Sequence, residues 1–179
     1  MRLIPIALGL AAGVSILSLA ACGTGEPPRS GAGSRSAPPI VIRPLFPADY
    51  MAAASSTDLY EIRSSELALT RARHPHHRDF ARMMISAHTG TSAQLSFAGR
   101  RLNLLPAARL LPRHQAMLDE LTAAPDFDAV YHRQQIAVHE AALKLHGDFA
   151  ARGESPTLRA VARNTVPIVR RHLEAMRRM

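Results

Sequence analysis

Apolar residues recur every three or four positions along four long stretches of the chain, which is the periodicity of amphipathic α-helices. The stretches cover about residues 49–73, 76–102, 126–152 and 155–179. Alternating runs typical of strands, and the Asn-Gly or Asp-Gly dipeptides typical of hairpin turns, do not occur in the sequence. The pattern therefore predicts an all-α domain.

The connections between these stretches predict how the helices are arranged. His74-Pro75 ends the first stretch, and Gly153 with Ser155-Pro156 separates the third from the fourth. The second connection, residues 103–125, is long, contains three prolines and holds only a short amphipathic piece at 113–123. Since short connections join antiparallel neighbours, we expect an antiparallel four-helix bundle with a long connector between helices 2 and 3.

The N-terminus has the pattern of an export signal. Arg2 is followed by an apolar stretch and then by Leu19-Ala20-Ala21-Cys22, which resembles the lipobox of bacterial lipoproteins. Cys22 is the only cysteine in the chain. We therefore predict a signal peptide at 1–21, cleavage before Cys22 and lipidation of its sulfur. An ordinary signal peptide that contains a cysteine, or a membrane-spanning helix, are the alternatives.

Residues 22–48 carry many Gly, Pro, Ser and Arg residues and few apolar ones, which is typical of a disordered tether. The folded domain is then expected at 49–179. These segments together predict an exported protein anchored to a membrane through its N-terminal lipid. Gly23, rather than Asp, follows the cysteine and favours the outer membrane, facing the periplasm.

The net charge and the aromatic content indicate which classes of partner to expect. The formal net charge is +8, and aromatic residues make up 4% of the chain, with no Trp. A basic balance raises nucleic acid or anionic lipid as partners. The arginines are spread along the chain without interleaved aromatic residues, and the export signal removes the chain from the cytosol. We therefore expect no nucleic-acid partner and name the membrane alone, with protein partners left open.

Polar residues occur on helix faces that should be apolar. His88 and His172 lie on the apolar seams of their helices, His139 lies beside one, and Glu61 is the acid on the inward side of the first helix. Counted from a turn between residues 74 and 75, Glu61 and His88 are each about thirteen residues away, and His139 and His172 lie at similar levels around residue 154. His146, one heptad after His139, is a weaker candidate.

Two interpretations of this set remain open. One carboxylate and three imidazoles suit a transition metal such as Zn²⁺, Cu²⁺ or Fe²⁺. The alternative is a buried hydrogen-bonded cluster that only stabilises the fold of a structural or protein-interaction module of the envelope, related to stress. An enzyme is the least favoured class, because the sequence has no Glu-x-x-His pair for a di-iron centre, no Gly-x-Ser-x-Gly and no glycine-rich phosphate loop.

Several short segments resemble the DUF4142 family of ferritin-like domains, in order and with matching spacing. They begin at Tyr60-Glu61-Ile62, Phe80-Ala81-Arg82, Phe127-Asp128-Ala129, Val138-His139-Glu140 and Val166-Pro167-Ile168. The resemblance implies a ferritin-like bundle, often exported, whose biochemical role is not established. It maps the recurrent acid and histidines of the family onto Glu61, His88, His139 and His172. One departure is Ala87, where the family commonly has Asp before the histidine.

Overall fold

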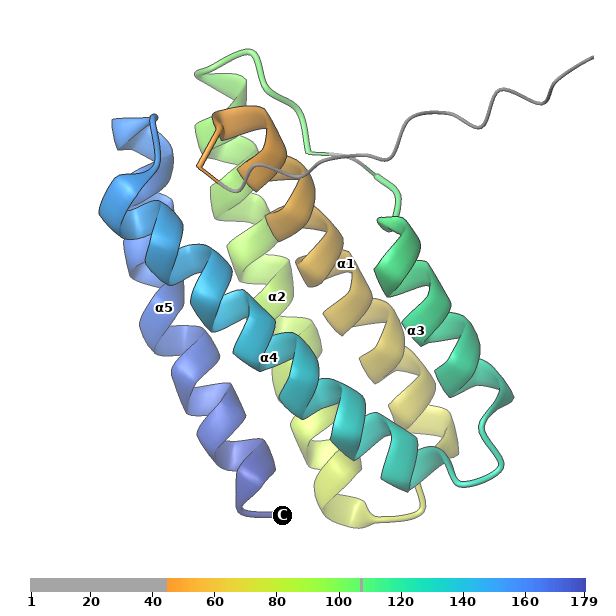
Figure 1. Ribbon diagram of the computed structural model, residues 1–179. Coiled ribbons are helices and arrows are strands. Elements are labelled where there is room, and N and C mark those ends of the chain that lie inside the picture. The colour runs from red at the N-terminus through yellow and green to blue at the C-terminus, as the bar shows by residue number, and fades with distance from the viewer. Residues whose placement is uncertain (1–44, 107) are drawn as a thin grey trace, which may run out of the picture. The chain divides into compact units, whose positions relative to one another are not determined.

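The computed structural model describes residues 45–106 and 108–179. The predicted signal peptide, Cys22 and the predicted tether as far as residue 44 lie outside the described residues. The described part contains no strand. Its helices are α1 (Pro47–Arg71), α2 (Pro75–Arg100), α3 (Pro112–Ala123), α4 (Phe127–Arg152) and α5 (Pro156–Arg177) (Figure 1). Among the described helices, none combines the length and the apolar character needed to span a bilayer.

Four of these helices form the predicted antiparallel bundle. α1 packs against α2, α2 against α5, α5 against α4, and α4 against α1, so the four surround one core (Figure 1). The connector between α2 and α4 contains α3, which packs on the outside against α1 and α4. The all-α fold and the four-helix bundle expected from the periodicity are thus confirmed.

The helix boundaries follow local chemistry that the sequence displays. Asp126 and Ser155 precede α4 and α5, and their side-chain oxygens accept the N–H of Ala129 and of Leu158, each at 3.3 Å. α1 begins at Pro47, two residues before the predicted start. Gly153 follows α4 as predicted, but its φ of −59° is not left-handed. Glycine fits there because a Cβ would lie 2.5 Å from the ring of Phe149.

Two apolar clusters occupy the two ends of the core. The cluster at the α1–α2 turn includes Phe80, Met84, Tyr131 and Met176. The cluster at the opposite end includes Tyr50, Leu95, Phe149 and Leu158. Along each of the four long helices, buried polar residues lie between the residues of the two apolar clusters. Together they form a polar middle layer of the bundle. This layer contains Asp58, Glu61, Ser64, Ser65, His88, Thr91, Gln135, His139, Thr165 and His172.

α1 contributes most of the polar residues of this layer. The periodicity of this stretch predicts an inward face with Met51, Ala54, Ser55, Ile62, Ser65, Leu69 and Ala72. The structure buries all of these residues except Ile62 and Leu69, which are only half-buried. Asp58 and Glu61 are buried on this helix as well. A helix with such a face is held in the bundle by hydrogen bonds as well as by apolar contacts.

Candidate metal centre

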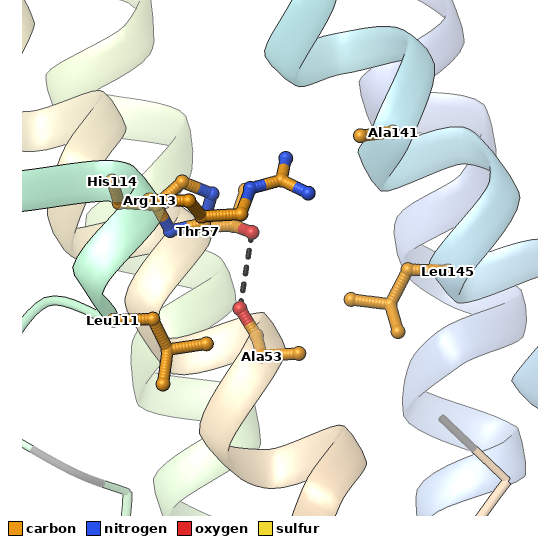
Figure 2. A pocket seen from close by; sticks show the side chains of 7 residues that line it. All are labelled: Ala53, Thr57, Leu111, Arg113, His114, Ala141 and Leu145. Carbon is orange, nitrogen blue, oxygen red and sulfur yellow. Dashed lines mark hydrogen bonds between the residues drawn. The ribbon is translucent and has the colours of Figure 1, made fainter. Parts of the chain in front are cut away.

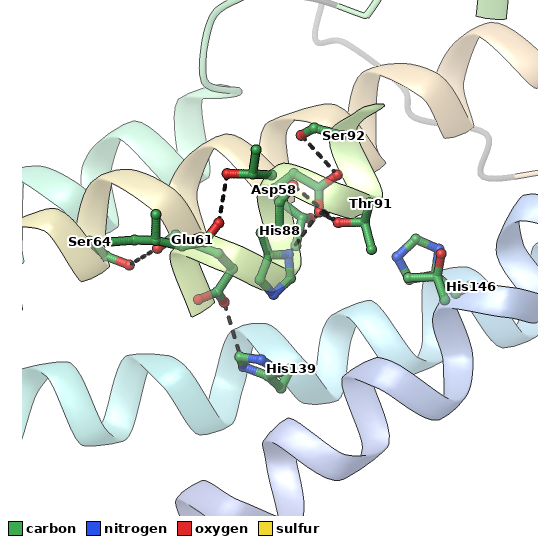
Figure 3. A network of polar contacts seen from close by, with 12 residues as sticks. Asp58, Glu61, Ser64, His88, Thr91, Ser92, His139 and His146 are labelled. Atoms are coloured by element: carbon green, nitrogen blue, oxygen red, sulfur yellow. Dashed lines mark hydrogen bonds and ion pairs between the residues drawn. The ribbon is translucent and has the colours of Figure 1, made fainter. Parts of the chain in front are cut away.

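Three imidazoles from three helices meet in the polar layer. His88 comes from α2, His139 from α4 and His172 from α5, and their exposed fractions are 2%, 1% and 4%. The ring centroids are 5.9 Å apart for His88 and His139, and 5.5 Å apart for each of the other two pairs. One ligand atom of each residue lies within 4.8 Å of the other two. The two labelled rings of His88 and His139 approach each other from facing helices in Figure 3.

Hydrogen bonds fix the orientation of two of these rings. The Nδ1–H of His88 donates to Oδ1 of Asp58 at 2.8 Å. The Nδ1–H of His139 donates at 2.8 Å to the backbone oxygen of Gln135, one turn earlier on α4. In the neutral form of each ring, a proton on Nδ1 leaves the lone pair on Nε2. A carboxylate or carbonyl acceptor on the second ring nitrogen is the usual arrangement around metal-binding histidines.

The inward ring nitrogens have no partner within the chain. Nε2 of His88, Nε2 of His139 and Nδ1 of His172 are buried and make no hydrogen bond to any described residue. Buried polar atoms in folded proteins nearly always have a partner, so each such atom requires an explanation. Three unpartnered nitrogens on three converging rings provide the donor set of a three-histidine metal site.

The spacing of the rings can be compared with that of a bound ion. Metal–nitrogen bonds of about 2.0–2.1 Å at tetrahedral angles place two ligating nitrogens about 3.4 Å apart. A ring nitrogen lies about 1.2 Å from its centroid, so two rings that share an ion have centroids about 5.3 Å apart at the tetrahedral angle and at most about 6.5 Å apart when the ion lies in line between them. The three centroid distances lie between these two values, and separations of ligand atoms up to 4.8 Å require a small inward rotation of the rings.

Glu61 lies beside this triad without being bonded into it. Its side chain has no exposed surface, and Oε1 is 3.5 Å from Nδ1 of His139 (Figure 3). Neither carboxylate oxygen accepts a hydrogen bond from the described residues. Glu66, the other acid of α1 that the sequence places near an inward position, is exposed. Burial of a carboxylate without donors is costly, and a nearby cation offsets that cost.

The acid that contacts His88 is Asp58 rather than Glu61. Oδ1 of Asp58 accepts hydrogen bonds from His88 and from the Thr91 hydroxyl, each at 2.8 Å, and Oδ2 accepts one from Ser92 at 3.2 Å (Figure 3). The expected pairing of Glu61 with His88 assumed a turn centred between residues 74 and 75. α1 ends at residue 71 and α2 begins at residue 75, which centres the turn on residue 73.

Asp58 was the functional residue that the sequence interpretation missed, although a signal was present. It lies seven residues after Met51 and seven before Ser65, on the face that turns inward. An acid at such a position predicts a buried, hydrogen-bonded carboxylate. The family commonly has Asp directly before this histidine, where the chain has Ala87. In this chain, the carboxylate that orients His88 comes from Asp58 of α1 instead.

The electrostatics of the layer distinguish the three rings. Burial, together with repulsion by His88, His139 and Arg171, lowers the pKa of His172 to about 3. Burial also lowers the pKa of His139, although Glu61 opposes this effect. For His88, burial lowers the pKa, but the hydrogen bond that the ring donates to Asp58 and the charges of Glu61 and Asp58 outweigh burial and raise the pKa. His139 and His172 are therefore neutral at pH 7, as metal ligands must be.

His146, the weaker candidate ligand, lies outside the group of three imidazoles. It is buried, and its Nδ1 shares a hydrogen bond of 3.0 Å with the hydroxyl of Tyr50. Burial lowers the pKa of His146 to about 4, while the charge of Asp58 raises it and that of His88 lowers it. Its partner in the structure is thus Tyr50 rather than the rings of the triad.

A surface hollow lies on another side of the bundle (Figure 2). It measures about 220 Å³, lies between α1, α3 and α4, and is lined mainly by aliphatic side chains such as Leu111 and Leu145. His114 lines it as well, and Nδ1 of this ring is 2.7 Å from the hydroxyl of Ser56. The residues that line this hollow do not include the triad, so the candidate metal centre is a buried site of the core.

The fold and this site define an all-α bundle protein with a buried three-histidine cluster. The chain belongs to the DUF4142 family, described as a domain of unknown function, whose sequence profile matches residues 44–179. The family resemblance of the sequence is thus confirmed. No curated protein matches the chain.

Several solved structures share the fold, and they are structures of CopM. The Cu(II)-bound form is 19% identical, with a TM-score of 0.63, over 74% of this chain and 94% of that chain. The Ag-bound form is 18% identical, with a TM-score of 0.61, over 74% and 93% of the two chains. The Cu(I)-bound form is 19% identical, with a TM-score of 0.62, over the same shares. This likeness establishes a common fold.

Proposed function

We propose that this chain is a non-enzymatic metal-binding protein of the cell envelope, which holds one transition-metal ion on His88, His139 and His172. The observation that carries the proposal is the convergence of three buried, unpartnered imidazole nitrogens from three helices. Glu61 lies beside the ion in this proposal and balances its charge, either directly or through water.

Copper is the ion that we favour. Neutral imidazole binds Cu²⁺, Zn²⁺ and Fe²⁺, and among these the affinity of a given nitrogen site is highest for Cu²⁺. The solved structures of CopM, which has the same fold, include Cu(II)-bound and Cu(I)-bound forms. Zn²⁺ is the second choice, because three histidines and one further ligand also form a tetrahedral zinc site.

A purely structural role for the polar layer is the competing hypothesis. A network that serves only the fold is expected to satisfy its own donors and acceptors. Asp58 meets that expectation with three hydrogen bonds. The carboxylate of Glu61 and the inward nitrogens of the triad do not meet it. The unpartnered atoms therefore favour a bound cation over a structural network.

The experiment that tests the proposal measures retained metal. The purified full-length chain, loaded with Cu²⁺ and dialysed, is expected to retain one equivalent that His139→Ala and His172→Ala both lose. His76→Ala is the matched control, because His76 is exposed and lies far along the sequence from the triad. Equal copper contents in the wild type and both triad variants would overturn the proposal.

A second measurement separates binding from a structural role. Copper is expected to raise the melting temperature of the wild type and to leave that of His139→Ala unchanged, because an ion that binds only the folded state stabilises it. If the cluster were only structural, the variants would lower the melting temperature equally with and without copper.

Export and anchoring are proposals that rest on the N-terminal sequence. We propose that residues 1–21 are removed, that Cys22 carries the lipid and that residues as far as about 48 tether the domain to the outer membrane, on its periplasmic side. Mass spectrometry of the protein from bacterial membranes is expected to find acyl chains on the N-terminal peptide. Cys22→Ser is expected to lose them and to release the domain from the membrane fraction.

A further inference from the structure

A second group of histidines lies at the end of the bundle, where α1 turns into α2, α4 begins and α5 ends. A hollow of about 350 Å³ at this end is lined by residues from all three places. They are His74, His77, Asp126, Asp128, Ala129, His132 and Met179. None of them belongs to the triad of the polar layer.

One histidine of the hollow is held by a carboxylate. His77 is 8% exposed, and its Nδ1–H donates to Oδ1 of Asp128 at 3.0 Å. The other carboxylate oxygen accepts the backbone N–H groups of Arg73 and His74, at 3.0 and 3.1 Å. Asp128 is thus fixed by three donors, and it fixes His77 in the tautomer whose lone pair is on Nε2.

A second histidine of the hollow is oriented in the same way. The Nε2–H of His132 donates to the backbone oxygen of Met176 at 3.1 Å, which places the lone pair on Nδ1. The rings of His77 and His132 have centroids 6.0 Å apart, within the limit of about 6.5 Å for two rings that share an ion. Both lone pairs belong to rings that line the same hollow.

His74 and Met179 also line this hollow and could contribute ligands. The ring of His74 has its centroid 5.4 Å from that of His77, and Met179, whose side chain ends in a thioether, is 48% exposed. Within the described residues, the triad of the polar layer is the one group of three His, Cys, Asp or Glu side chains whose ligand atoms lie within 4.8 Å. The end hollow therefore provides three imidazoles and a thioether, while the carboxylates of Asp126 and Asp128 already accept hydrogen bonds from the chain.

We propose that this hollow is a second metal site, which binds a monovalent coinage-metal ion, Cu(I) or Ag(I), between Nε2 of His77 and Nδ1 of His132. Such ions accept two or three ligands and favour imidazole and thioether over carboxylate. Met179 provides the third ligand. The site is open to solvent, so it takes up the ion directly at the surface, independently of the buried triad.

The test uses Ag(I), which needs no reductant, and the full-length chain with His139→Ala as the background, so that the triad is disabled. That protein is expected to bind one Ag(I) by titration calorimetry. Adding His132→Gln or His77→Gln is expected to weaken this binding at least about tenfold. His76→Ala in the same background is the control, because this neighbouring histidine does not line the hollow.

Histidine-selective NMR provides the second readout on the same samples. Ag(I) is expected to shift the ring resonances of His77 and His132 and to leave that of His114 unchanged. The His77 variant loses the hydrogen bond to Asp128 and could unfold for that reason. The His132→Gln variant keeps that bond and therefore tests the site without this risk. Unweakened Ag(I) binding in both variants, or ring shifts confined to other histidines, would overturn the second site. Failure of the triad would be recognised separately, as copper retention that His139→Ala does not change.

Discussion

Asp58 and Glu61 are two buried carboxylates one turn apart on α1, and their surroundings are opposite. Asp58 is 5% exposed and accepts three hydrogen bonds, from His88, Thr91 and Ser92. Glu61 is fully buried and accepts none from the described residues. A buried carboxylate whose lone pairs are filled by the protein is part of the fold, whereas one without donors is available to a cation.

The same contrast applies to the imidazole nitrogens around the two acids. The Nδ1–H groups of His88 and His139 point to acceptors of the protein, and their Nε2 atoms have no partner. One side of each ring therefore belongs to the satisfied part of the polar layer and the other to the unsatisfied part. In the proposed function, Asp58 therefore positions His88, and the ion lies on the side of Glu61.

The largest expected effect is that of removing Asp58. Asp58→Ala leaves the donors of His88, Thr91 and Ser92 unpaired inside the bundle, and we expect it to lower the free energy of unfolding by about 3–5 kcal/mol. Urea denaturation in metal-free buffer measures this change. Asp79→Ala is the control, since Asp79 is exposed. A loss below about 1 kcal/mol would contradict the structural role of Asp58.

The next effect concerns pH and His146, a buried histidine outside the triad whose ring is hydrogen-bonded to Tyr50. Its pKa is about 4 in the folded chain, below the ordinary 6.5 of the unfolded chain. Between these values the unfolded chain takes up a proton that the folded chain does not. The contribution of His146 to the free energy of unfolding is therefore fully present above pH 6.5. It falls by about 3 kcal/mol as the pH approaches 4.

The variant His146→Gln keeps a group that can bond to Tyr50 but does not titrate. We expect it to lose about 3 kcal/mol less than the wild type when urea denaturation at pH 7 is compared with that at pH 4. Equal losses in the two proteins would show that His146 does not contribute to the acid sensitivity of the fold.

Glu61 is expected to respond in the opposite direction to Asp58. Glu61→Gln removes a buried charge that has no donors, so in metal-free buffer we expect the free energy of unfolding to rise by about 1–2 kcal/mol. The same variant is expected to weaken copper binding about tenfold or more. Asp58→Asn is the matched comparison and is expected to destabilise. If Glu61→Gln destabilised the fold as much as Asp58→Asn, the two carboxylates would not differ in the way described above.

The smallest expected change in stability comes from removing one of the three donors to Asp58, the hydroxyl of Thr91. Thr91→Val has nearly the same shape as threonine but lacks the hydroxyl that donates to Asp58. We expect a loss of about 1 kcal/mol in urea denaturation, with copper binding unchanged. A change in copper affinity without a loss of stability would place Thr91 on the ligand side of the layer.

Much of the fold could be predicted from the sequence because its signals are local. The periodicity of the four stretches, the cap residues Asp126 and Ser155 and the proline after Ser155 predict the four long helices to within a few residues. The inward face of α1 was harder to predict, because many of its buried residues are small or polar. Ile62 and Leu69, which the periodicity places on that face, are only half-buried.

The candidate site could be predicted in part. The inward histidines His88, His139 and His172 stand out because polar rings at apolar positions break the pattern of their helices. The pairing of acids with rings depends on where each turn is centred. An error of less than two residues at the first turn exchanged Asp58 for Glu61 as the partner of His88. The partner of His146, Tyr50, lies 96 residues away and could not be found from local patterns.

The most direct test of the central claim is a crystal structure of the copper-loaded chain with anomalous diffraction at the copper edge. We predict an anomalous peak in the polar layer, about 2.0–2.1 Å from Nε2 of His88, Nε2 of His139 and Nδ1 of His172, with the carboxylate of Glu61 beside it. A polar layer without a copper peak, with the ring centroids still 5.5–5.9 Å apart, would contradict the account.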